Sequence, residues 1–165
     1  MRIEPIDTYG SPSPNPVDWF GTGNLDLLLG SFIDFLSFFR SAYRRMERLP
    51  FKLDLCMIQP RVVQWHADGR PSVVVGIEDG TVVLLENTEQ KGQTPRLSPP
   101  RYLEHVDPFV KSGPLSRPVA VDWNGDGKLD LISETAPERC STSRTSGRRR
   151  SRHLWTVGRC ARAGM

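Results

Sequence analysis

An eleven-residue pattern occurs three times in this chain, and it constrains the fold more than any other feature of the sequence. The copies occupy residues 17–27, 63–73 and 121–131 and align with one another without gaps. Each copy begins with Val, has Trp at its third residue and passes through a polar segment into an apolar run. Self-similarity of this kind indicates a fold built by stacking copies of one small structural unit.

The first two copies continue to match beyond the polar segment. Residues 27–30 align with 73–76, and residues 35–39 align with 81–85. Each unit therefore reads as strand, polar loop, apolar strand, tight turn and second apolar strand. The turn of the second unit contains Asp79-Gly80 between β-branched runs, which is a strong hairpin signal.

The spacing and the apolar runs together predict the architecture. The copies start 46 and 58 residues apart, close to the period of about 40 to 50 residues typical of β-propeller blades. Nearly continuous apolar strands suit sheets that are buried on both faces. We therefore expect an all-β fold of about three propeller blades that form an incomplete propeller. Trp19, Trp65 and Trp123 are expected to pack between blades rather than to stack on a ligand.

Charge divides the chain into two parts. Its net charge of +3 hides a C-terminal stretch, residues 139–165, with eight arginines and no acidic residue. After residue 133 the repeat pattern is also lost partway through a unit. We expect repeats over 1–136 and a disordered Arg/Ser-rich tail over 137–165. A reading-frame shift or truncation is one hypothesis for the tail, and a basic arm for nucleic acid is a less favoured one.

The polar segment of the third copy has the composition of a calcium loop. Numbered from Asp122, it offers side-chain oxygens at positions 1, 3, 5 and 9 from Asp122, Asn124, Asp126 and Asp130, and the backbone carbonyl of Lys128 at position 7. Calcium takes six to eight oxygen ligands at about 2.3–2.6 Å, and carboxylates in a tight turn can converge at that distance. The alternative is an Asx-rich turn without an ion.

The other two loops offer fewer carboxylates. The first keeps Asp18, Thr22 and Asp26 and is expected to be a weaker second site, because calcium affinity follows ligand charge and number. The second has one carboxylate, Asp68, and is expected to bind no ion. There, hydrogen bonds from Gln64 and Ser72 are expected to replace it.

These loops resemble the FG-GAP/VCBS repeats of integrin-like β-propellers, in which each blade begins with an Asp-x-Asp/Asn-x-Asp-Gly-x-x-Asp loop followed by an apolar strand. The third loop matches the calcium ligands of that family position by position, whereas Asp18 and Asp26 match only the two ends. Residues 59–88 look like bacterial VCBS-repeat proteins. The resemblance covers roughly residues 14–134.

The resemblance implies a non-catalytic calcium-binding scaffold that binds a protein or glycan ligand in an extracellular or periplasmic setting. The alternative is a fragment of a propeller-based carbohydrate-active enzyme of the polysaccharide lyase type. The sequence shows neither a signal peptide nor an apolar stretch long enough to span a membrane. A propeller closes with about four to eight blades, so we expect a fragment, a chain that associates with further copies, or a marginally stable one.

No catalytic residue can be assigned from the sequence. His66, His105 and His153 have no acid or nucleophile at a motif-like spacing, and the three cysteines are far apart and suggest neither a zinc site nor a disulfide framework. On the resemblance we favour a non-catalytic module, and the enzyme fragment stays the alternative.

Overall fold

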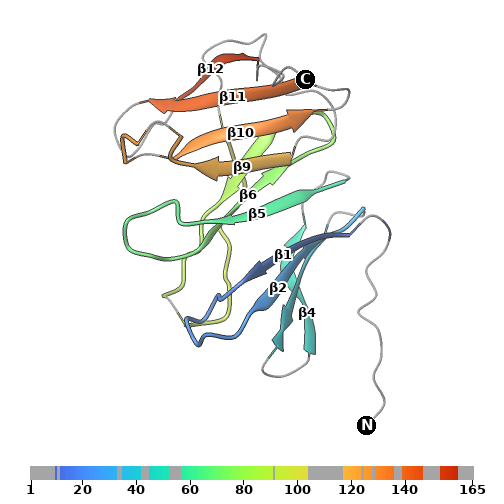
Figure 1. The fold of residues 1–165 in the computed structure, drawn as a ribbon. Helices are drawn as coiled ribbons and strands as arrows, with labels where there is room; N and C mark the ends of the chain where they lie inside the picture. Colours follow the sequence, from blue (N-terminus) through green and yellow to red (C-terminus); the bar gives the residue numbers. More distant parts are fainter. Residues whose placement is uncertain are drawn as a thin grey trace, which may run out of the picture.

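The structure, a computed structural model, describes residues 10, 12–32, 35–41, 45–52, 57–90, 92–103, 117–123, 125–127, 129–135, 139–146 and 153–159. In this part the protein is all-β and forms three antiparallel sheets of four strands each (Figure 1). Each sheet is a meander in which the strands lie side by side in chain order.

The first sheet contains β1 (Ser13–Val17), β2 (Asp26–Gly30), β3 (Phe35–Arg40) and β4 (Arg45–Lys52). The middle sheet contains β5 (Gln59–Val63), β6 (Ser72–Gly76), β7 (Val82–Leu85) and β8 (Arg101–Tyr102). The third sheet contains β9 (Arg117–Val121), β10 (Asp130–Thr135), β11 (Arg139–Ser146) and β12 (His153–Arg159). Every repeat copy thus begins at the end of the first strand of a sheet and runs into the second.

The hairpin expected at Asp79-Gly80 is present between β6 and β7. Gly80 has a φ of 85°, which a glycine adopts without steric cost. Its N–H donates to the carbonyl of Ile77 at 3.0 Å, and the Asp79 carboxylate accepts from the N–H of Thr81 at 2.9 Å. The turn sets the pairing register of the two most apolar strands.

The middle sheet is buried on both faces, as the apolar runs predicted. Alternate residues of a strand point to opposite faces, and the two faces of β6 and β7 belong to two different clusters. Val73, Val75, Val83 and Leu85 pack with the first sheet, whereas Val74, Val82 and Leu84 pack toward the third. The middle sheet therefore lies between the other two (Figure 1).

The first strands of the sheets lie next to one another, with β5 in contact with both β1 and β9. The Asn15 side chain of β1 links β1 to β5: its Oδ1 accepts from the N–H of Val62 at 3.2 Å, and its Nδ2 donates to the carbonyl of Pro60 at 3.4 Å. Gly30, at the end of β2, lies so close to β5 that a Cβ atom there would be 2.5 Å from Cδ of Pro60.

The C-terminal stretch differs from the expectation of a disordered tail over 137–165. Its described residues form β11 and β12, which complete the third sheet by pairing with β10 and with each other. Strand pairing uses backbone groups, and without β11 the edge of β10 that faces away from β9 would leave a row of them unpaired. That requirement does not depend on apolar alternation, so the side-chain pattern gave no sign of it. The expectation of disorder is corrected for these two segments.

None of the described residues lies in a helix with the length and apolarity that crossing a membrane requires.

Candidate metal-binding loops

The first loop, residues 18–26, is organised by the carboxylate of Asp18. Its Oδ1 accepts from the N–H of Thr22 at 2.9 Å and its Oδ2 from the N–H of Gly23 at 2.8 Å. Gly21 and Gly23 both have positive φ, at 69° and 81°, which lets the backbone curl around the side chain. One carboxylate at loop position 1 thus holds the N–H groups of positions 5 and 6.

The third loop, residues 122–130, has the same geometry in its described part. Oδ1 of Asp122 accepts from the N–H of Asp126 at 3.0 Å, and its Oδ2 accepts from the N–H of Gly127 at 2.8 Å. Gly125 and Gly127 have positive φ, at 73° and 78°. The two loops therefore fold in one way although their position 5 differs. Asn124 and Lys128, the other residues expected to bind calcium here, lie outside the described residues.

The carboxylate at loop position 9 is buried in both loops. Asp26 is 3% exposed and Asp130 is 1% exposed. Oδ2 of Asp130 accepts from the N–H of Trp123 at 3.2 Å. Oδ1 of Asp26 accepts from the N–H and hydroxyl of Ser41, at 3.0 and 3.4 Å, while its Oδ2 is buried without a hydrogen-bond partner. A buried carboxylate oxygen without a partner is costly unless a cation or water satisfies it.

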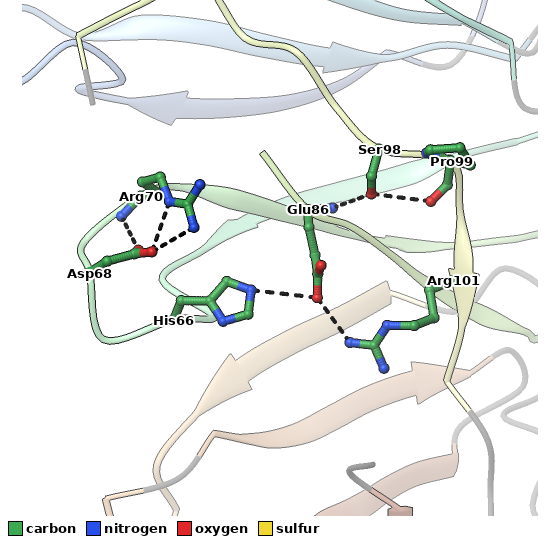
Figure 2. Close-up of polar contacts among 7 residues, drawn as sticks. All are labelled: His66, Asp68, Arg70, Glu86, Ser98, Pro99 and Arg101. Carbon is green, nitrogen blue, oxygen red and sulfur yellow. Dashed lines mark hydrogen bonds and ion pairs between the residues drawn. The ribbon is translucent and has the colours of Figure 1, made fainter. Parts of the chain in front are cut away.

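The second loop holds a side-chain cation. Asp68, at loop position 5, accepts from the backbone N–H of Arg70 at 3.0 Å and from its Nε at 2.8 Å, and Nη2 of Arg70 lies 2.7 Å from the carboxylate (Figure 2). The hydrogen bond from the Arg70 side chain lowers the pKa of the Asp68 carboxyl, and the same bond raises the pKa of Arg70. The only carboxylate of this loop is thus paired within the loop.

The hydrogen bond expected from Ser72 in this loop is not observed, and the contact that the loop forms is that of Arg70, at position 7, with Asp68. Oγ of Ser72 is buried and has no hydrogen-bond partner. Sequence reasoning missed Arg70 because loop position 7 was considered only as the source of a backbone carbonyl.

A second polar group lies beside this loop. Oε1 of Glu86 contacts Nε2 of His66 at 3.4 Å and Nη2 of Arg101 at 3.1 Å, so one carboxylate faces both cations (Figure 2). All three side chains are about one-third exposed or more. These groups are therefore paired with one another at the surface of the protein.

The three loop tryptophans differ in their surroundings. Trp19 packs in the cluster between the first and middle sheets, and Trp65 packs in the cluster between the middle and third sheets, as expected. Trp123 is 67% exposed. The expectation of packing between sheets is therefore wrong for Trp123, because among the described strands no further sheet packs on this side of the third sheet.

The structure brings together the expected ligands only in part. The Asp18 carboxylate contacts Thr22 through the backbone N–H of Thr22, and the Asp122 carboxylate contacts Asp126 through the backbone N–H of Asp126. Within the described ranges, no group of three or more His, Cys, Asp or Glu side chains is placed to hold a metal ion. Calcium coordination would therefore need carbonyl, amide or hydroxyl oxygens besides carboxylates, which is the donor set that calcium commonly takes.

Comparisons of this chain with protein-family models, with curated proteins and with solved structures found no match.

Proposed function

We propose that this chain is a non-catalytic β-propeller repeat scaffold in which the third loop, and more weakly the first, binds calcium. The observation that supports it best is the shared geometry of the two loops. In each, the carboxylate at position 1 holds the N–H groups of positions 5 and 6, and a buried carboxylate stands at position 9.

The donor set fits calcium chemically. Asp122, Asp126 and Asp130 offer carboxylate oxygens on a loop that two glycines allow to close, and hard cations prefer such oxygens. In the first loop, the unpartnered Oδ2 of Asp26 is the kind of group that a bound cation would satisfy. The order of affinity we expect is third loop, then first loop, with no binding in the second, where Arg70 is paired with Asp68.

A bound ion would stabilise the folded chain by mass action. At a calcium concentration a hundred times the dissociation constant, the gain is about 2.7 kcal/mol. The chain would then present its loops to a ligand on a scaffold that the ion makes more rigid. Protein and glycan ligands both suit such a scaffold.

Isothermal titration calorimetry with calcium tests this function. We expect a heat of binding that is lost at the third loop in Asp126→Ala, because position 5 then has no carboxylate. Asp68→Ala is the matched control: it removes the carboxylate at the same position of the second loop and should leave the heat unchanged. A heat of binding that Asp126→Ala leaves at full size contradicts the assignment.

Terbium luminescence supplies a second readout. Trp123 follows Asp122 directly, so its indole can transfer energy to a lanthanide in the third loop. We expect terbium emission on excitation of Trp, its loss in Asp126→Ala, and displacement by calcium. Emission that persists in this variant and vanishes in Asp18→Ala would move the stronger site to the first loop.

A further inference from the structure

One set of three residues recurs on the same face of each sheet, and we name this face the Trp-bearing face. It consists of the last residue of the first strand, the loop Trp and a central residue of the second strand. The sets are Val17, Trp19 and Leu28 in the first sheet, Val63, Trp65 and Val74 in the middle sheet, and Val121, Trp123 and Ile132 in the third sheet.

The first two sets are buried against the next sheet. Trp19 and Leu28 belong to the cluster that contains β6 and β7, with Val17 packed against it. Val63, Trp65 and Val74 belong to the cluster that contains Leu131 of β10 and is flanked by Ala120 of β9. The same contact between neighbouring sheets therefore occurs twice within one chain.

The opposite face of a sheet accepts this set, and we name it the receiving face. In the middle sheet it is formed by Val62, Val73, Val75 and Leu85, all of which lie in or against the first cluster. The aligned residues of the first sheet are Pro16, Leu27, Leu29 and Phe39. Strand pairing places them in the same arrangement, because Leu27 pairs with both Pro16 and Phe39 just as Val73 pairs with both Val62 and Leu85.

Among the described residues, one face of each kind has no other sheet packed on it. On the Trp-bearing face of the third sheet, Trp123 is 67% exposed, Val121 is 37% exposed, and their neighbour Val119 is 47% exposed. On the receiving face of the first sheet, Pro16 is exposed and Leu27 and Phe39 are half-buried, although Leu29 is buried. Contiguous exposed apolar patches mark interaction surfaces in soluble proteins.

We propose that these two faces dock on each other between two copies of this chain. The Trp-bearing face of the third sheet of one copy packs on the receiving face of the first sheet of the other. This contact has the same arrangement as the two contacts between neighbouring sheets within the chain. The two faces are therefore expected to be complementary in shape. A head-to-tail contact generates a ring if the rotation closes. Two copies joined by two such contacts form a six-sheet ring, within the range of about four to eight sheets that propellers use. The inference does not depend on metal binding.

Sedimentation velocity of the full chain tests the proposal, with far-UV circular dichroism to confirm folding. We expect the unmodified protein to sediment with twice the mass of one chain. Trp123→Glu should give a folded monomer and raise the dissociation constant at least about thirtyfold, as loss of an interface hot spot does. Tyr102→Glu, which changes an exposed aromatic residue at the outer edge of the middle sheet, is the matched control and should remain dimeric.

Mixing two variants separates this contact from a symmetric one. Leu27→Glu blocks the receiving face and Trp123→Glu blocks the Trp-bearing face, so each variant alone should be monomeric. An equimolar mixture should form a dimer through the one pair of intact faces. A Leu27→Glu protein that remains fully dimeric overturns the proposal, because it indicates pairing of two Trp-bearing faces.

Two further outcomes are decisive. A wild-type chain that is monomeric at every concentration overturns the proposal. If Trp123→Glu also abolishes glycan binding by that monomer, the exposed Trp123 binds a ligand and not a second copy. A ladder of larger species that Trp123→Glu abolishes supports the contact and overturns the closed ring.

Discussion

Asp68 and Arg70 form the most completely paired ionic contact among the described loops, with three donor atoms of one arginine directed at one carboxylate. The pKa of Asp68 is lowered from 3.8, first by the side-chain hydrogen bond of Arg70 and next by its backbone N–H. A carboxyl whose pKa is lower in the folded chain stabilises the fold above its unfolded pKa. This contribution is lost as the pH falls through the lower, folded pKa.

The stability that this pair supplies should therefore be constant from neutral pH down to about one pH unit above 3.8 and decline as the pH falls further, through the folded pKa. NMR titration of the Asp68 carboxyl carbon measures the folded pKa on which this expectation depends. In Arg70→Gln we expect the Asp68 pKa to rise toward 3.8, because the side-chain hydrogen bond and the charge are both removed. Arg96→Gln, which removes an arginine paired with Glu89 instead, should leave the Asp68 titration in place. An unchanged Asp68 pKa in Arg70→Gln would rule out this cause.

The sequence predicted which residues form strands and loops, but it did not predict which side chains contact one another. The position of Asp122 and Asp126 in one loop follows from spacing alone. The pairing of Arg70 with Asp68 depends on the path of the folded loop, which composition does not specify. The exposure of Trp123 could not be predicted either, since burial depends on whether a following sheet exists.

The absence of a side chain at Gly30 lets the backbone of β2 approach β5 closely. A Cβ there would clash with the carbonyl oxygen of Ile58 and with Pro60. Because the obstacle includes backbone, Gly30→Ala should lower the free energy of unfolding by about 1–3 kcal/mol, as overpacking does. Urea denaturation measures it. Gly69→Asn is the control: Gly69 has positive φ and open space around it, and Asn adopts that conformation readily, so the change should be within about 0.5 kcal/mol. Equal effects of the two substitutions would contradict the proposed clash.

At the scale of strands, the apolar runs predicted β2, β3, β6 and β7 well. Apolar runs do not predict a strand that is stabilised by backbone pairing with its neighbour and has no apolar pattern of its own. β11 is arginine- and serine-rich, yet its backbone pairs with β10 along five residue pairs. β4, an outer strand of the first sheet, likewise begins in a stretch that is rich in arginine.

Across the whole molecule, burial is greatest in the middle sheet. β6 and β7 are buried along their entire length and packed from both sides, whereas the first and third sheets each pack against one other sheet in the described part of the chain. Local opening is rarest where apolar contacts are densest. Amide hydrogen exchange should therefore be slowest in β6 and β7 and faster in β1 and β9. Equal protection of the three sheets in a monomeric variant such as Trp123→Glu would contradict this gradient.

The overall arrangement could be predicted as far as repeated sheet units stacked on one another. The repeat predicts units, and the structure shows three sheets in which the middle one is covered on both faces. The number of sheets in a complete assembly depends on which sheet faces pack against one another. The spacing of the repeats along one chain does not specify these contacts.

The pairing of Arg70 with Asp68 has a consequence for how the protein responds to its surroundings. A guanidinium two residues from its carboxylate is tethered, so its effective concentration is fixed by the chain and cannot be diluted. Under the proposed function, a chelator would remove a soluble ion from an outer loop but could not remove this guanidinium. The loop of the middle sheet would then keep its cation when calcium is withdrawn, and only the first and third loops would respond to calcium.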